Sequence, residues 1–360
     1  MVGVFYFCIM FDYIIVGNGI AGVCLAEVAL QHNKKILVFD NGSQPSSRIA
    51  GGLYNPVVLK RFSEIWKAKE QVDLVESFYP KLEKKLQVTF DYKLPIFRKF
   101  ASIEEQNNWF QAADKPSLSD FLNTKLVAQV SPLVSSAFGF GEVLNTGYLD
   151  IKSLVENYSN YLKEQNLLVE ETFDYSRIEF LEDGVKYDAI QAKQIVFCEG
   201  FGLHANPFFN DLPLDGTKGE LLIIKAPELK LEGIVKSNIF LLPIGNDLYK
   251  VGATYNWQDK TNEPTAEGKS ELLTNLEDLI ACDYEVVHHF AGVRPTVKDR
   301  RPLVGTHHKY KQLHILNGLG TRGVMLGPFL AKQLFEHLEE QKPLESEIDI
   351  RRFYKKRGLL

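Results

Sequence analysis

The sequence predicts an α/β chain, α+β overall, in which a β-α-β unit is combined with strand-rich segments farther along. Residues 12–41, DYIIVGNGIAGVCLAEVALQHNKKILVFDN, contain two apolar runs separated by a glycine-rich turn and a helical pattern. Residues 218–229, 237–255 and 285–295 contain apolar and β-branched runs interrupted by turn residues. An apolar content of 45% in 360 residues suits a sizeable core and about two domains, or one large domain with an insert.

Charge and cysteine content argue against several classes of protein. The formal net charge of −5 gives no general attraction for nucleic acid or for an anionic membrane. Cys8, Cys24, Cys198 and Cys282 lack the CxxC spacing of a zinc site, and their dispersal favours a reducing compartment over a disulfide framework. We therefore expect a cytoplasmic protein without a metal site.

The first ten residues, MVGVFYFCIM, are apolar. They lack a basic flank and a small-residue cleavage site, so we expect no signal peptide, and no other segment reaches transmembrane length. We expect this segment to be an extended start of the chain or an additional strand end.

A dinucleotide-binding pattern begins at the first apolar run. Residues 13–16 predict a buried strand, which Gly17, Gly19 and Gly22 follow as GxGxxG. The first glycine permits a tight turn, the second lets the backbone approach a pyrophosphate, and the third lets a helix pack against the strand. The helix predicted over residues 20–31 would direct its first N–H groups toward the phosphates.

The second predicted strand ends at Asp40, 18 residues after Gly22, where a carboxylate can accept hydrogen bonds from a ribose. This Rossmann-like arrangement predicts a dinucleotide site without choosing between FAD and NAD. The next segment, residues 41–56, is rich in Ser, Gly and Pro and predicts a loop rather than another regular β-α repeat. Such a loop favours FAD, and a long helix is predicted to follow over residues 63–86.

Further segments carry a resemblance to a known family. They are SSRIAGGLYNP, NTGYLDIKSLVENYSNYL, AKQIVFCEGF, DGTKGELLIIK, GVRPTVKDRRPLVG and LNGLGTRGVMLGPFLAKQLFEHL. With the glycine fingerprint, they resemble the FAD-dependent amine oxidases typified by D-amino-acid oxidase, glycine oxidase and sarcosine oxidase. Two positions depart from that family, because Asp40 replaces the commoner Glu and Cys198-Glu199-Gly200 replaces the commoner Ala-x-Gly.

The resemblance implies two interleaved domains. A Rossmann-like FAD-binding domain would take residues 1–85, 145–215 and 295–360, and an antiparallel-sheet substrate domain would take residues 86–144 and 216–294. Within the latter, IGND predicts a hairpin turn and residues 265–281 predict an amphipathic helix.

The resemblance also implies which residues contact FAD. A glycine cluster near residue 320 precedes a helix predicted from about Pro328 to Glu339, whose positive end would stabilise an anionic reduced flavin. The full set of expected contacts is Gly17, Gly19, Ile20, Ala21, Gly22, Asp40, Asn41, Ser47, Arg48, Ala50, Gly51, Gly52, Gly200, Gly320, Arg322, Gly323 and Val324.

Arg294, Arg322 and Tyr255 are the expected catalytic residues. In the resembling enzymes the arginine of GxRP pairs with the substrate carboxylate, which a planar guanidinium matches in a bidentate manner. Arg294 is that arginine here, unless it is a structural partner of an acid. Arg322 would add a second positive charge over the active site, unless it is only solvated. Tyr255 and Tyr54 would contact the substrate, unless they only pack against neighbouring residues.

The expected function is FAD-dependent oxidation of the C–N bond of an amino acid or N-substituted glycine, by hydride transfer to the flavin. Molecular oxygen or an unidentified acceptor would take the electrons. One alternative is the cleavage of a carboxymethylaminomethyl group on a tRNA wobble uridine, because AGGLYNP and DRRPLVG are also similar to the flavin domain of a bifunctional tRNA-modifying enzyme. The other is a flavin- or nucleotide-binding protein without turnover. The terminal run RRFYKKR suits a solvated face or, alternatively, an RNA contact.

Overall fold

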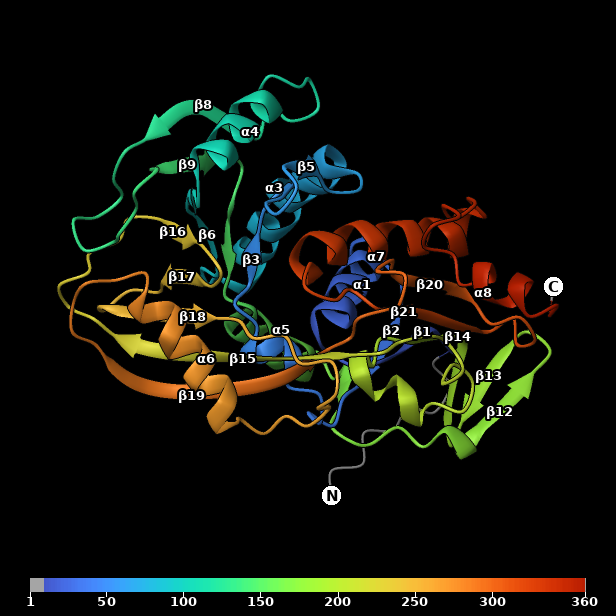
Figure 1. Ribbon diagram of the computed structural model, residues 1–360. Coiled ribbons are helices and arrows are strands. Elements are labelled where there is room, and N and C mark those ends of the chain that lie inside the picture. The colour runs from blue at the N-terminus through green and yellow to red at the C-terminus, as the bar shows by residue number, and fades with distance from the viewer. Residues whose placement is uncertain (1–9, 360) are drawn as a thin grey trace. The chain divides into compact units, whose positions relative to one another are not determined.

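The computed structural model describes residues 10–359 and divides into two compact units. The first unit comprises Met1–Arg48, Ile151–Gly216 and Arg294–Leu360, and the second comprises Ile49–Asp150 and Thr217–Val293 (Figure 1). The predictions for Cys8 and for the start of the chain lie outside the described residues. Among residues 10–359, no helix is both long enough and apolar enough to cross a membrane.

The sheet of the first unit is built around the strand of the glycine fingerprint. β1 (Met10–Val16) pairs in parallel with β2 (Ile36–Phe39) and with β14 (Ile190–Phe197). The strand order is β11-β2-β1-β14-β13-β12, and β21 pairs with both β14 and β20. The remaining strands are β11 (Leu168–Val169), β12 (Ile178–Leu181), β13 (Gly184–Tyr187), β20 (Leu303–Thr306) and β21 (Leu313–Asn317).

The helices of this unit confirm much of the predicted pattern. α1 spans Ile20–Gln31, as predicted, and is buried along most of its length because it packs against both the sheet and α7. α7 (Gly323–Glu340) begins five residues before the predicted Pro328. Gly323 opens this helix close to α1, since a Cβ there would lie 3.1 Å from Ile20. The unit also contains α2 (Ser46–Ile49), α5 (Ile151–Glu164), η1 (Tyr175–Arg177), η2 (Gly200–Ala205) and α8 (Arg351–Lys356).

The arginines of the basic run RRFYKKR form ion pairs with acidic residues of the first unit. On α8, Arg351 contacts Asp349 and Arg352 contacts Asp299. Arg357, just after the helix, contacts Asp211. These contacts tie the run to its own unit and leave mainly its lysines to face solvent.

The second unit contains a mainly antiparallel sheet with strand order β19-β15-β18-β17-β16-β7-β9-β8. The predicted IGND turn is confirmed, because it joins the antiparallel strands β17 and β18. α6 (Ala266–Glu277) confirms the predicted amphipathic helix, and its Leu272 and Leu276 share a core with Val235, Leu241 and Val251 of the sheet. The strands are β7 (Ile96–Lys99), β8 (Leu122–Val127), β9 (Phe140–Val143), β15 (Thr217–Lys225), β16 (Ile234–Lys236), β17 (Phe240–Pro243), β18 (Leu248–Gly252) and β19 (Glu285–Arg294).

Two local predictions are corrected in this part of the chain. Residues 41–56, predicted as a loop, contain α2 and the short strand β3 (Leu53–Tyr54). The helix predicted from residue 63 begins later, as α3 (Ala68–Leu86), because Lys67 adopts a left-handed conformation with φ 53°. The residues before it form a small hairpin of β4 (Val57–Val58) and β5 (Ser63–Glu64). A further helix, α4 (Ile103–Ala113), follows later in the chain.

The unit boundaries differ from the predicted layout at residues 49–85, which lie in the second unit. Strand pairing explains the difference, since β3 pairs with β10 (Gly147–Leu149) and β10 also pairs with β6 (Asp91–Lys93). The assignment of one unit to FAD and the other to substrate stays a prediction.

Candidate dinucleotide and substrate site

The fingerprint turn leaves no room for side chains at two of its glycines. Gly17 has φ +101°, and a Cβ on it would lie 2.6 Å from the carbonyl oxygen of Cys198. A Cβ on Gly22 would lie 1.9 Å from the carbonyl oxygen of Gly17. The first contact joins β1 to β14, and the second presses α1 against the turn, as the motif predicts.

The third glycine lies beside the flavin-loop segment predicted from the sequence. A Cβ on Gly19 would lie 3.0 Å from the hydroxyl of Ser47, and that hydroxyl accepts a hydrogen bond from the Ile20 N–H at 3.1 Å. Ser47 thereby satisfies one of the first N–H groups of α1, which have no partner within the helix. Ala21 lies buried in the same first turn.

Asp40 follows β2 and faces the fingerprint turn. One carboxylate oxygen accepts the Asn18 N–H at 3.4 Å, and the other lies 3.7 Å from the Arg48 guanidinium. Asn41 is turned to a different partner, because its amide donates to the Thr172 hydroxyl at 3.1 Å. The structure thus groups Asp40 and Arg48 with the turn, while the Asn41 side chain is engaged elsewhere.

Asn18 was not among the predicted site residues. Its side chain is buried, its Nδ2 donates to Ser159 Oγ at 2.8 Å, and its Oδ1 has no hydrogen-bond partner within residues 10–359. A buried acceptor without a partner is costly, so this atom indicates a missing donor. Its place between two fingerprint glycines was the signal that could have identified it.

A second glycine cluster lies against the end of β14 in the same unit. The Asn317 amide donates to the Gly200 carbonyl at 2.9 Å, and the Gly320 N–H donates to the Pro295 carbonyl at 3.1 Å. Gly200 and Gly320 both have φ +56°, and no atom lies within 4 Å of a Cβ built on either. Together these bonds bring the ends of β14, β19 and β21 into one region with the fingerprint turn.

The two predicted arginines lie at the ends of elements in this region. Arg294 is the last residue of β19 and is half-buried. It precedes Pro295, whose carbonyl is bonded to Gly320. Arg322 is the N-cap residue of α7, and its carbonyl accepts the N–H groups of Met325 and Leu326. Gly323 and the buried Val324 open the helix that follows.

The other predicted residues belong to the second unit. A Cβ on Gly51 would lie 2.7 Å from the Phe240 ring, and one on Gly52, which has φ +76°, would lie 1.9 Å from the Leu149 carbonyl. Ala50 precedes them and is half-buried. The cluster of the first unit therefore does not include this glycine pair.

The two tyrosines of this unit differ in exposure. Tyr255 follows β18 and is 61% exposed. Its loop is anchored by the buried Lys218, whose ammonium group contacts Asp259 at 2.5 Å and the Thr261 hydroxyl at 3.2 Å. Tyr54 is buried instead, and its hydroxyl lies 2.8 Å from Asp91. Its burial and this contact favour packing over substrate binding.

Comparison with known proteins identifies the family. A model described as "DAO: FAD dependent oxidoreductase" matches residues 12–337. The chain belongs to this family of FAD-dependent oxidoreductases.

Relatives are distant but cover most of the chain. Glycine oxidase from Bacillus subtilis (strain 168) is 22% identical, over 88% of this chain and 90% of its own length. The tRNA 5-methylaminomethyl-2-thiouridine biosynthesis bifunctional protein MnmC from Marinobacter nauticus is 21% identical over 91% of this chain, which spans 55% of that protein. The crystal structure of glycine oxidase from Geobacillus kaustophilus has the same fold, with a TM-score of 0.77 at 20% identity over 96% of this chain and 98% of that one.

The residues of this oxidoreductase fit its cofactor, FAD. Gly17 and Gly22 hold the turn tight against β14 and α1, and Gly19 presents no side chain at the start of α1, where a pyrophosphate would approach. The buried Oδ1 of Asn18 lacks a donor, and Asp40 offers carboxylate oxygens at the same turn. A nucleotide carries hydroxyl donors for both.

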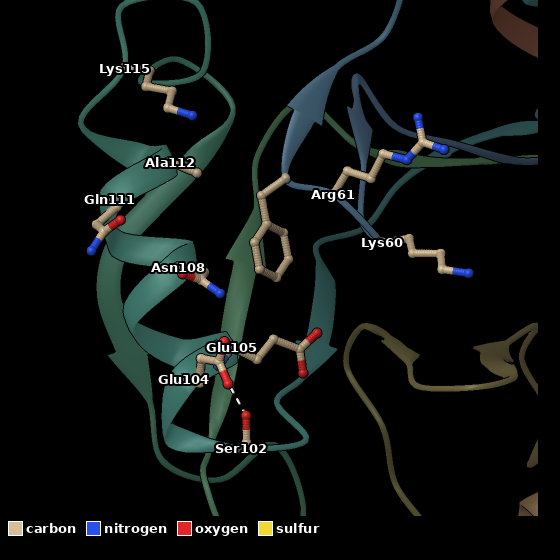
Figure 2. A pocket seen from close by; sticks show the side chains of 10 residues that line it. Lys60, Arg61, Ser102, Glu104, Glu105, Asn108, Gln111, Ala112 and Lys115 are labelled. Carbon is tan, nitrogen blue, oxygen red and sulfur yellow. Dashed lines mark hydrogen bonds between the residues drawn. The ribbon is translucent and has the colours of Figure 1, made fainter.

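This oxidoreductase also has a polar hollow that was not predicted from the sequence. It lies in the second unit, beside the β4–β5 hairpin and α4, and its volume is about 410 Å³ (Figure 2). Basic side chains, acidic side chains and amides share its wall: Lys60, Arg61, Lys115, Glu104, Glu105, Asn108 and Gln111. Because both charge signs are present, the hollow does not favour one class of ion. Within the described chain, no cluster of three or more His, Cys, Asp or Glu residues could hold a metal.

Proposed function

We propose that this FAD-dependent oxidoreductase oxidises the C–N bond of an amino acid or N-substituted glycine. The observation that carries the proposal is the hydrogen bond between the Gly320 N–H and the Pro295 carbonyl, which ties the arginine-bearing end of β19 to the glycine cluster before α7. An arginine fixed in this way suits a clamp for the carboxylate of a substrate. We also propose that the protein is cytoplasmic and that oxygen or another acceptor reoxidises it.

Arg294 would orient the substrate and compensate its charge. A carboxylate moved out of water needs a fixed cation, because an unpaired buried charge is very costly. The bound FAD supplies a hydride acceptor, and the substrate loses that hydride from its α-carbon and a proton from its nitrogen. The resulting imine takes up water to give a carbonyl compound and an amine. Arg322 and Tyr255 would complete the site by adding charge and by excluding water.

The experiment that tests this proposal is anaerobic mixing with glycine, sarcosine, proline and both enantiomers of common amino acids. We expect flavin bleaching by at least one carboxylate-bearing amine in the wild type. Arg294→Ala should remove most of that bleaching while FAD stays bound. Arg294→Lys should weaken substrate binding strongly, since a lysine keeps the charge but loses the planar fork.

A matched control comes from the surface of the first unit. Arg177 is exposed and pairs with Asp174 and Asp188, so Arg177→Ala should leave bleaching unchanged. Bleaching that survives Arg294→Ala intact would contradict the carboxylate clamp. A wild type that no amine reduces would contradict the function itself.

The similarity to MnmC supports a second candidate, in which the N-substituted glycine is a modified wobble uridine of tRNA. This candidate predicts fast flavin reduction only by RNA bearing carboxymethylaminomethyluridine. The rate should fall steeply with added salt, because phosphate contacts release counterions. Fast reduction by free amino acids that is insensitive to salt would exclude it.

A further inference from the structure

The polar hollow of the second unit carries charged side chains that have no partner. Lys60, Arg61 and Lys115 line it, and none of them forms an ion pair or a side-chain hydrogen bond within residues 10–359. The Glu104 carboxylate on the same wall is unpaired as well within these residues. These groups give the hollow three free cations and one free carboxylate, an excess of positive charge.

Glu105, the other acidic residue of the wall, is already occupied. Its carboxylate contacts the Arg98 guanidinium at 2.7 Å and accepts the Ala101 N–H at 2.6 Å. Its own N–H donates to the Ser102 hydroxyl at 3.1 Å, so Ser102 caps the start of α4. Glu105 therefore adds no free charge to the hollow.

One wall of the hollow is a single face of α4 and of the turn after it. Its residues recur at intervals of three and four, which places them on one side of a helix. They are Glu104, Asn108, Gln111 and Lys115. Figure 2 shows this wall with the β4–β5 hairpin on the other side. The two amides have no partner among residues 10–359, so they are free to donate and accept hydrogen bonds between the acid at one end and the cation at the other.

The other wall is the tip of the β4–β5 hairpin, which Phe62 holds in place. The Phe62 ring is buried and packs edge-on against Trp109 of α4, with 5.4 Å between the ring centroids. Its backbone is left-handed, with φ 45°, a conformation that costs free energy in a bulky residue. The packing on Trp109 offsets that cost. The backbone of Lys60 and Arg61 is therefore held beside α4 before any ligand binds.

We propose that this hollow binds a small acidic zwitterion, a molecule with one ammonium group and two acid groups, as in an acidic amino acid. The excess of cations favours two acid groups over one. Glu104 favours an ammonium group, because a plain dianion would leave that carboxylate unpaired and repelled. A volume of about 410 Å³ is within the range of small-molecule sites. The site lies within the second unit and does not depend on the proposed oxidation.

The experiment measures binding by equilibrium dialysis of the FAD-bound protein against labelled glutamate, with each enantiomer tested separately. Glutarate has the same two carboxylates without the amine, and glutamine has the same amine with one carboxylate replaced by an amide. Arg294→Ala is the background for all measurements, because it lacks the proposed clamp for a substrate carboxylate. We expect glutamate to bind about 2- to 5-fold more tightly than either analogue, the contribution of one exposed ion pair.

Variants of the two walls test whether glutamate binds in the hollow. Arg61→Met and Lys115→Met together should weaken glutamate binding about 4- to 25-fold, the product of two such ion pairs. Glu104→Gln should equalise the binding of glutamate and glutarate, because it removes the partner of the ammonium group. Lys125→Met, which removes an exposed lysine of β8 in the same unit, is the matched control and should leave glutamate binding unchanged. All these side chains are exposed, so the core stays intact.

A lack of glutamate binding by both the wild type and Arg294→Ala would overturn the proposal. So would binding that Arg294→Ala removes, or that Arg61→Met with Lys115→Met leaves unchanged, because the ligand then lies elsewhere. Equal binding of glutarate and glutamate would exclude the zwitterion. Glutamate held in the hollow of a protein whose flavin no amine reduces would support this site and contradict only the proposed oxidation.

Discussion

Glu199 is an acidic side chain in the segment Cys198-Glu199-Gly200, which departs from the family's commoner Ala-x-Gly. It follows β14 directly, accepts hydrogen bonds from the Tyr175 hydroxyl at 2.5 Å and from the Asn206 amide at 2.8 Å, and lies largely out of water. Burial raises the pKa of Glu199 from 4.5 to about 7, and the two hydrogen bonds offset only part of that rise. At neutral pH this carboxyl group is therefore divided between its charged and neutral forms.

The pKa of Glu199 has a consequence for stability. The unfolded chain releases this proton near pH 4.5 and the folded chain releases it near pH 7, so the contribution is present below pH 4.5 and is lost as the pH rises through 7. We expect the free energy of unfolding to fall by up to about 3 kcal/mol over this window, and Glu199→Gln to remove that fall. Urea unfolding of both proteins at several pH values measures it. Parallel pH profiles would contradict the prediction.

Single residues were predictable where a local motif fixes their surroundings. Gly17, Gly22 and Asp40 lie as the fingerprint pattern indicates. Lys218 was not predictable, because its contacts with Asp259 and Thr261 depend on how separated segments of the chain pack together. Asn18 falls between these cases. Its place in the glycine fingerprint can be read from the sequence, but only the folded structure shows that its side-chain oxygen is buried without a hydrogen-bond partner.

The β-α-β element of β1, α1 and β2 is the part of the fold that tests FAD binding most directly. Asp40→Ala removes a charged acceptor at the turn, which should weaken FAD binding by about 1.5–3 kcal/mol, or roughly one to two decades in Kd. Fluorescence titration of the apoprotein with FAD measures this change. Asp183→Ala, at an exposed turn between β12 and β13, is the control and should bind FAD as the wild type does. Equal affinity of both variants would mean that Asp40 only ends its strand.

Elements were predicted best where hydrophobic periodicity and turn signals agree. α1 begins and ends at the predicted residues, and the IGND hairpin is where the sequence places it. The predicted starts of α3 and α7 were wrong, because hydrophobic periodicity does not show the left-handed backbone at Lys67 or the first turn of α7 at Gly323. Periodicity reports which face is buried, and it reports helix ends poorly.

At the scale of the whole molecule, we expect bound FAD to raise the thermal stability of the protein. The purified protein should be yellow, with about one FAD per chain that acid or heat releases. A ligand that binds only the folded state stabilises it by about 2.7 kcal/mol when its free concentration is 100 times Kd. We therefore expect the Tm of the apoprotein to rise with each addition of FAD in a thermal melt. A Tm that FAD does not change would contradict a folded-state site.

The two units of the structure and the two predicted domains are divided along the chain in a similar but not identical way. The predicted alternation of segments resembles the observed one, since both units are assembled from separated stretches of chain. Residues 49–85 lie in the second unit, where β3 pairs with β10, a strand that follows about a hundred residues later in the sequence. Pairing over that distance has no local signature.

The interleaving of the units also sets an order of events during synthesis. β1 leaves the ribosome well before its parallel partner β14, which follows about 180 residues later, and α7, which packs on α1, begins about 300 residues after α1. The nascent β1 and α1 therefore emerge with their apolar faces uncovered while the second unit is translated. A chaperone that shields apolar segments has its longest opportunity there, and the first unit can complete its core only after α7 has been translated.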